Sequence, residues 1–151
     1  MASFLPGAPE FEDRVRASFA RQRVMATLGA RIVHIAPGEV DLELPFRQDL
    51  TQQHGFLHAG ILTTLGDSAC GYAAFSLMPA ETGVLSVEFK VNLLAPARGE
   101  RFLARGRVTR PGRTLTVCQG EVVAFHDGDE KTVAVLLATV MTIRDRPGIE
   151  D

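Results

Sequence analysis

The sequence predicts an α+β protein in which a six-stranded antiparallel sheet wraps around one long central helix, with a second helix at the N-terminus. One apolar stretch of helical length stands in the middle of the chain, and stretches with the two-residue alternation of strands lie on both sides of it. Dipeptides typical of tight turns separate neighbouring strands, which favours antiparallel pairing. One face of the sheet must cover the central helix, because a helix that is apolar on all sides has to be enclosed by protein.

Hydrophobic period and turn signals assign each element. Pro9 and Gly29 bound the first helix, since proline suits the start of a helix and glycine suits the position after its end. Tight turns are predicted at Pro37-Gly38, at Pro111-Gly112 and at 126–129. The predicted order is a helix at 10–25, strands at 30–36 and 40–46, a loop at 47–57, a helix at 59–78, and strands at 83–94, 101–110, 114–125 and 132–143.

The strand that follows Gly83 shows the clearest alternation. We expect it to have one apolar and one polar face. The apolar face would carry Leu85, Val87, Phe89, Val91 and Leu93, and the polar face Ser86, Glu88, Lys90 and Asn92.

The central helix has the composition of a buried helix. Residues 60–78 are nearly long enough to span a membrane, but Asp67 lies near their centre and no basic cluster flanks them. Gly66 and Gly71 each cost roughly 1 kcal/mol relative to alanine inside a helix. We therefore expect another backbone, from the sheet or from a second copy of the helix, to approach them closely.

Composition excludes several classes of function. The chain has 151 residues, 46% hydrophobic and 23% charged, which suits one domain over 1–151 with a fold core at about 30–143. Its 16 basic and 18 acidic residues give a net charge of −2, so we expect neither a nucleic-acid partner nor a membrane partner. Two cysteines and an N-terminus without a leader pattern favour a cytoplasmic location.

Asp67 is the first candidate for chemistry. A carboxylate in a mostly apolar helix must find partners or take up a proton, because burying it ionised and unpaired is very costly. An exposed position on the helix is the alternative, but a solvated face would carry more charges than the stretch from His58 to Glu81 contains.

The residues around the helix start form a second candidate. His54 and His58 lie four apart, and His58 falls where free backbone N–H groups gather positive potential that suits an anion or an oxyanion. The simpler interpretation, which the sequence favours for each histidine, is a hydrogen-bonding loop residue. No zinc site is expected, because the zincin glutamate is missing and the cysteines are distant.

Two further motifs are weaker. Ser68 in Gly66-Asp67-Ser68 matches the start of a serine-hydrolase motif, but it lies inside a helix rather than on the exposed turn that such a nucleophile requires. Arg110 and Arg113 flank a tight turn and are able to grip a phosphate, although surface turns often carry arginine without a ligand.

Taken together, these residues resemble the hotdog-fold acyl-CoA thioesterases of the PaaI-like, phenylacetate-degradation group. The family's His-Gly-Gly followed by an aspartate is similar to His58-Ala59-Gly60 with Asp67, and the loop before it is similar to Gln52-Gln53-His54-Gly55. The segments 86–90 and 95–96 resemble the family's long strand and its closing proline. The resemblance covers about residues 30–143 and implies the hotdog fold.

The resemblance also implies roles for individual residues. Asp67 would be the nucleophile or the general base, and the Ala59 N–H would polarise the thioester carbonyl. Gln52 takes the place of a family asparagine near the reacting centre, and His58 would orient the helix start. The residues expected to bind the substrate are His54, Gly60, Ser86, Lys90, Arg110 and Arg113, and no cofactor or metal is expected.

The implied function is hydrolysis of an aromatic or medium-chain acyl-CoA by a homodimer or homotetramer, in which the strand from Leu85 to Leu94 pairs with its copy and the active site is shared between subunits. One activated carboxylate and a preorganised oxyanion site suffice for a thioester, whose thiolate leaves readily. The alternatives are a non-catalytic acyl-CoA-binding module of the same fold and a hotdog hydratase or dehydratase, which would need a histidine paired with an acid.

Overall fold

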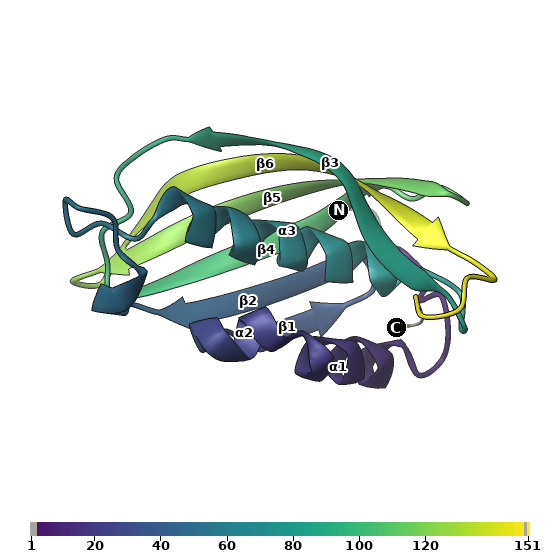
Figure 1. The fold of residues 1–151 in the computed structure, drawn as a ribbon. Helices are drawn as coiled ribbons and strands as arrows, with labels where there is room; N and C mark the ends of the chain where they lie inside the picture. The colour runs from purple at the N-terminus through teal and green to yellow at the C-terminus, as the bar shows by residue number, and fades with distance from the viewer. Residues whose placement is uncertain (1–2, 150) are drawn as a thin grey trace.

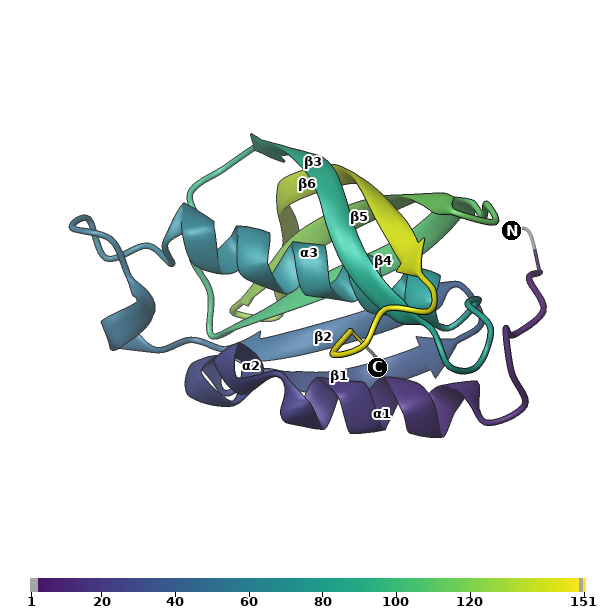
Figure 2. The ribbon, with the colours of Figure 1, turned by 45° about the vertical axis from the view of Figure 1, so that its right-hand side comes forward.

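The computed structural model describes residues 3–149 and 151, and its six strands form one antiparallel sheet in the order β1-β2-β4-β5-β6-β3. The sheet curls around helix α3 (Figures 1 and 2), which confirms the predicted α+β arrangement. The elements are α1 (Phe11–Arg21), α2 (Arg23–Leu28), β1 (Arg31–Ala36), β2 (Glu39–Pro45), the 3-10 turn η1 (Gln48–Leu50), α3 (Ala59–Phe75), β3 (Gly83–Leu93), β4 (Arg101–Arg110), β5 (Leu115–His126) and β6 (Asp129–Ile143).

The tight turns lie where turn chemistry predicts them. Gly38, with φ of 80°, closes the hairpin of β1 and β2, and Asp127 and Gly128, with φ of 49° and 87°, close that of β5 and β6. Two successive positive φ values match the twist of antiparallel strands, which is why Asp-Gly suits this turn. Strands β4, β5 and β6 form a meander, whereas β3 lies at the sheet edge beside β6.

Both predicted helices are shorter than expected. The helix predicted at 10–25 is broken at Gln22, whose ψ of 92° is extended, and α2 then buries Met25 and Leu28 in the core. The hydrophobic core therefore begins before residue 30. Helix α3 ends at Phe75, three residues before the predicted end, and Ser76 caps it.

The prediction that β3 alternates strictly between an apolar and a polar face is wrong for the first half of the strand. A β-bulge shifts the register between Ser86 and Glu88, so the residues before it lie on the opposite sides. Directly paired residues point to the same side of a sheet. Ser86 pairs with the buried Val140 and so faces α3, whereas Glu88 pairs with Thr139 and faces outward. Beyond the bulge the odd residues Phe89, Val91 and Leu93 face α3, in register with Ala138, Leu136 and Ala134.

Helix α3 contacts the sheet at two paired glycines, Gly106 on β4 and Gly120 on β5. A Cβ atom at Gly106 would lie 2.2 Å from the Ala69 carbonyl oxygen, and one at Gly120 would lie 2.9 Å from the Cys70 Sγ. The helix backbone can therefore approach the sheet this closely only where side chains are missing.

The glycines of the helix itself fit the prediction only in part. A Cβ at Gly66 would lie 2.7 Å from the Leu136 side chain, so the sheet does crowd this position, through a side chain rather than a backbone. Nothing described lies within 4 Å of a Cβ at Gly71. The expectation of a helix enclosed on all sides is wrong, because one stripe of α3 is only half-buried or exposed. This stripe consists of Gly60, Thr64, Asp67, Ser68 and Gly71.

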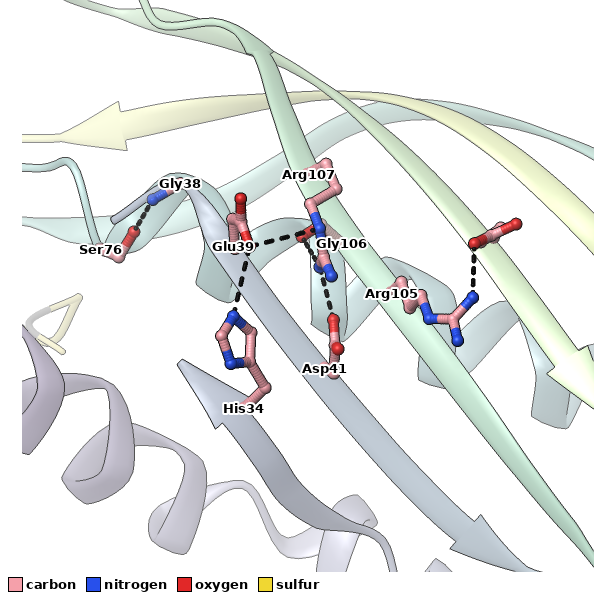
Figure 3. A network of polar contacts seen from close by, with 9 residues as sticks. His34, Gly38, Glu39, Asp41, Ser76, Arg105, Gly106 and Arg107 are labelled. Carbon is pink, nitrogen blue, oxygen red and sulfur yellow. Dashed lines mark hydrogen bonds and ion pairs between the residues drawn. The ribbon is translucent and has the colours of Figure 1, made fainter. Parts of the chain in front are cut away.

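Polar contacts tie the edge of the sheet to α3 (Figure 3). The hydroxyl of Ser76 accepts a 2.8 Å hydrogen bond from the Gly38 N–H, which joins the β1–β2 turn to the end of the helix. Nearby, Arg107 donates to Asp41 and lies 3.7 Å from Glu39.

No helix in the described part of the chain is both long and apolar enough to cross a membrane.

We predict that Gly106→Ala destabilises the fold by at least about 2 kcal/mol, because the new methyl group must push the helix backbone away from the sheet. The free energy of unfolding in urea measures this effect. The matched control is Gln119→Ala, an exposed position of β5 next to the other glycine, which should change stability by less than about 0.5 kcal/mol. Equal stability of the two variants would contradict the close contact.

Candidate active site

The start of α3 is capped by its own residue His58. The backbone of His58 is extended, with φ of −63° and ψ of 138°, and its ring Nδ1 accepts a 2.8 Å hydrogen bond from the Gly60 N–H. An acceptor at Nδ1 places the ring proton on Nε2 in the neutral form. The ring therefore caps the start of the helix. A hydratase would require a histidine paired with an acid, and within one chain His58 is not paired with Asp67.

The cap leaves one backbone donor of the first turn free. The N–H groups of Ile61 and Leu62 donate to the His58 carbonyl, and that of Gly60 donates to the ring. Within residues 3–149 and 151, the Ala59 N–H has no acceptor. A free donor at a helix N-terminus favours negative charge, which is the property that an oxyanion donor needs.

The loop before α3 brings Gln52 to the cavity that Ala59 also lines. The Gln52 side-chain oxygen accepts from the His54 N–H, so the loop fixes the side chain and leaves its NH₂ group available. His54 itself is exposed. Gln52 and Ala59 border a largely apolar cavity of about 480 Å³. Its other walls are Phe56, Leu57, Leu62 and the segment 93–97, which begins at the last residue of β3.

Asp67 lies halfway along α3, on the half-buried stripe, and faces the start of β3. The Ser86 hydroxyl donates a 2.7 Å hydrogen bond to Asp67 Oδ1. No donor in the described part of the chain contacts the second oxygen, Oδ2. One oxygen is therefore held in place while the other is available to a substrate or a water molecule.

A second cavity, of about 100 Å³, surrounds Asp67 and brings in residues that the sequence does not single out. Gln22, at the break between α1 and α2, accepts a 3.1 Å hydrogen bond from the Ser68 hydroxyl. Gln22 and Asp151, which lies in the segment after β6, are far from Asp67 in the sequence and meet it only in the folded protein. No local signal in the sequence therefore predicts them as neighbours. The lining residues are Gln22, Asp67, Ser68, Gly71, Tyr72, Val84, Ser86 and Asp151.

Three of the predicted substrate-binding residues lie away from both cavities. Lys90 pairs with the half-exposed Leu137 and so faces the side of the sheet turned away from α3. Arg110 and Arg113 are exposed at the far end of β4 and in the turn after it. This end of the sheet lies beside Ser76, because Val108 donates to Gly38 and Gly38 donates to the Ser76 hydroxyl.

The two cysteines do not offer a nucleophile. Cys70 and Cys118 are free and fully buried. Burial raises the pKa of the Cys118 thiol to about 12, and it raises the pKa of Cys70 as well. Both thiols are therefore protonated at neutral pH, whereas a nucleophilic cysteine must be a thiolate.

Comparison with known proteins identifies the family. The family model of the thioesterase superfamily matches residues 54–131, a stretch that includes His58, Asp67 and Ser86. A thioesterase family protein of Silicibacter pomeroyi is 60% identical, superposes with a TM-score of 0.88, and is matched over 89% of this chain and 98% of its own.

More distant relatives agree. Human acyl-coenzyme A thioesterase 13 is 32% identical over 85 residues, which are 56% of this chain and 60% of the human protein. The E. coli PaaI protein, from the phenylacetic acid degradation operon, shares the fold with a TM-score of 0.79 at 21% identity, over 89% of this chain and 94% of its own. The chain therefore belongs to the thioesterase superfamily, with the hotdog fold, and is a thioester hydrolase.

Proposed function

We propose that the protein hydrolyses the thioester of an aromatic or medium-chain acyl-CoA to the free acid and CoA, with Asp67 as the attacking carboxylate or general base. The observation that carries this proposal is the Asp67 carboxylate on an otherwise uncharged helix, oriented by Ser86 and open at Oδ2. The unpaired Ala59 N–H supports it as the oxyanion donor.

Two routes use these groups. In the first, Asp67 Oδ2 attacks the thioester carbon, the C–S bond breaks with loss of the CoA thiolate, and water then hydrolyses the mixed anhydride. In the second, Asp67 takes a proton from a water molecule, whose oxygen attacks the same carbon before the thiolate leaves. In both, negative charge develops on the carbonyl oxygen, where a fixed N–H stabilises the transition state more than the ground state.

One copy of the chain does not bring the two groups together. Ala59 and Asp67 are eight residues apart on α3, which corresponds to about 12 Å along the helix axis. Reacting atoms must approach to about 3–3.5 Å. We therefore propose that the Ala59 N–H of one subunit and the Asp67 carboxylate of the other act on the same thioester.

Strand β3 is suited to bring a second copy into this position. It is an edge strand, and five of its residues or immediate neighbours are apolar and more than 40% exposed, which is a strong signal for pairing. Ser86, at its start, contacts Asp67, whereas Leu93 and Leu94, at its end, line the cavity of Ala59. Antiparallel pairing of two β3 strands would place the start of each beside the end of the other.

The same arrangement bears on the CoA end of the substrate. A two-fold axis that brings the partner's Ala59 to Asp67 also brings the partner's helix start toward the end of the sheet that carries Arg110 and Arg113. We propose these arginines as contacts for the CoA phosphates. A doubling to a tetramer and a cytoplasmic location are proposed from the family resemblance and the composition.

Asp67→Asn should lower kcat at least about a hundredfold while the fold and CoA affinity stay unchanged, because the amide can neither attack nor accept a proton. Release of CoA, followed with a thiol-reactive dye over a panel of acyl-CoAs, measures this. Asp13→Asn, an exposed carboxylate of α1, is the control and should retain full activity. A folded Asp67→Asn protein with normal turnover would end the assignment and leave a site that only binds acyl-CoA.

Light scattering at micromolar concentration should show a dimer or tetramer. Val87→Lys, a charge in the exposed middle of β3, should yield monomers and lower activity in parallel, since lysine on an edge strand opposes pairing. The control is Val33→Lys on β1, the opposite edge, where the side chain is similarly exposed. A monomer that hydrolyses acyl-CoA at the normal rate would refute the shared site.

Replacing Arg110 and Arg113 together with alanine should raise KM for acyl-CoA about tenfold, the scale of one charge-assisted hydrogen bond, and leave kcat nearly unchanged. Exposed phosphate contacts are made equally in the ground and transition states. Added salt should have the same effect on the unmodified protein. Arg16→Ala, on the surface of α1, is the control, and an unchanged KM of the double variant at low salt would show that CoA binds elsewhere.

A further inference from the structure

The segment after β6 folds back across the start of β3 (Figure 2). Gly148, with φ of 85°, turns the chain, and Ile149 lies so close to Gly83 that a Cβ there would be 2.6 Å from the Ile149 carbonyl oxygen. This close packing places Asp151 against the body of the protein, between α1 and β3.

The carboxylate of Asp151 is held by groups from different elements. Its Oδ1 accepts a 2.9 Å hydrogen bond from the Ser18 hydroxyl of α1, and its Oδ2 accepts a 2.7 Å hydrogen bond from the Val84 N–H of β3. The Tyr72 hydroxyl of α3 lies 3.2 Å from the Ser18 oxygen. Because Ser18 gives its only proton to Asp151, Tyr72 is the donor of this contact, and burial raises the pKa of Tyr72 and keeps it protonated.

Asp151 shares the cavity of about 100 Å³ with Asp67. Asp67 and Ser86 line it on the side of the proposed reaction, and Asp151, Tyr72 and Gln22 contribute polar groups to its other walls.

The substrate has two arms that need space on opposite sides of the thioester. The CoA arm must lead to solvent and is long, so the wider cavity of about 480 Å³, which lies beside the partner's Ala59 in the shared site, suits it. The acyl group is then left with the smaller cavity around Asp67. A carboxylate in the wall of that cavity excludes a long apolar chain, both by its volume and because it loses hydration against apolar atoms.

We propose that Asp151 is a specificity-determining residue whose side chain closes the acyl cavity and limits the length of the acyl group that reaches Asp67. The proposal rests on the thioesterase function proposed above. It commits the acyl group to the cavity beside Asp67 rather than to the apolar cavity beside Ala59.

The test compares kcat/KM for linear acyl-CoAs of four to twelve carbons. In Asp151→Ala, the kcat/KM for octanoyl-CoA divided by that for butyryl-CoA should rise about tenfold. This is the scale of the discrimination that a pocket achieves when it admits or excludes one or two methylene groups. Asp145→Asn is the matched control: Asp145 lies in the same segment, is exposed, and has a φ of 50° that asparagine tolerates, so its ratio should stay unchanged.

A second measurement tests the contact independently of turnover. Hydrogen exchange of the Val84 amide should be faster in Asp151→Ala than in the control, because the amide loses its acceptor. If Asp151→Ala does not fold, Asp151→Asn keeps the shape and removes the charge, and its octanoyl ratio should still rise about threefold, in keeping with a partial loss of the barrier.

The outcomes separate the two proposals. A folded Asp151→Ala protein with an unchanged chain-length ratio would overturn the role of Asp151, and the thioesterase function would stand as long as Asp67→Asn is inactive. An unchanged ratio in Asp151→Asn, where that variant is needed, would overturn it as well. Failure of the unmodified protein to hydrolyse any acyl-CoA would instead refute the proposed function.

Discussion

The contact of α3 with the paired glycines, in which the helix backbone lies against Gly106 and the Cys70 side chain against Gly120, is the constraint on which the site depends. It holds Ala69 and Cys70 against the sheet and so fixes the rotation of the helix about its axis. The stripe that carries Asp67 is then turned away from the middle of the sheet, toward the start of the edge strand β3. A carboxylate there can be half-buried and held by one hydrogen bond without the cost of full burial.

Features that depend on neighbouring residues could be predicted from the sequence. The turns at Pro37-Gly38 and Asp127-Gly128 follow from local backbone preferences, and the start of α3 follows from the change from a loop at 47–57 to an apolar stretch of helical length. The lone carboxylate in a mostly apolar helix singled out Asp67, and the family resemblance supplied Ala59 as a candidate for catalysis. The structure places both beside cavities.

Features that depend on distant residues could not be predicted. The bulge at Val87 turns Ser86 toward Asp67, yet strict alternation along β3 gives no sign of it. The helix breaks at Gln22 although neither proline nor glycine lies there. The Gln22 side chain contacts Ser68, which is far away in the sequence and close only in the folded protein. The position of β3 beside β6 rather than β4 is likewise set by tertiary packing. The edge strand that results links the two halves of the proposed site.

The claim that each site uses Ala59 from one subunit and Asp67 from the other is tested most directly by mixing two inactive variants. Ala59→Pro removes only an N–H without an acceptor, at the first helical position, where proline is tolerated after the extended His58. Unfolding and refolding Ala59→Pro and Asp67→Asn chains together in equal amounts should restore about a quarter of the normal activity, because half of the dimers are mixed and each mixed dimer has one intact site. Activity that stays at the level of the separate variants would contradict the shared site.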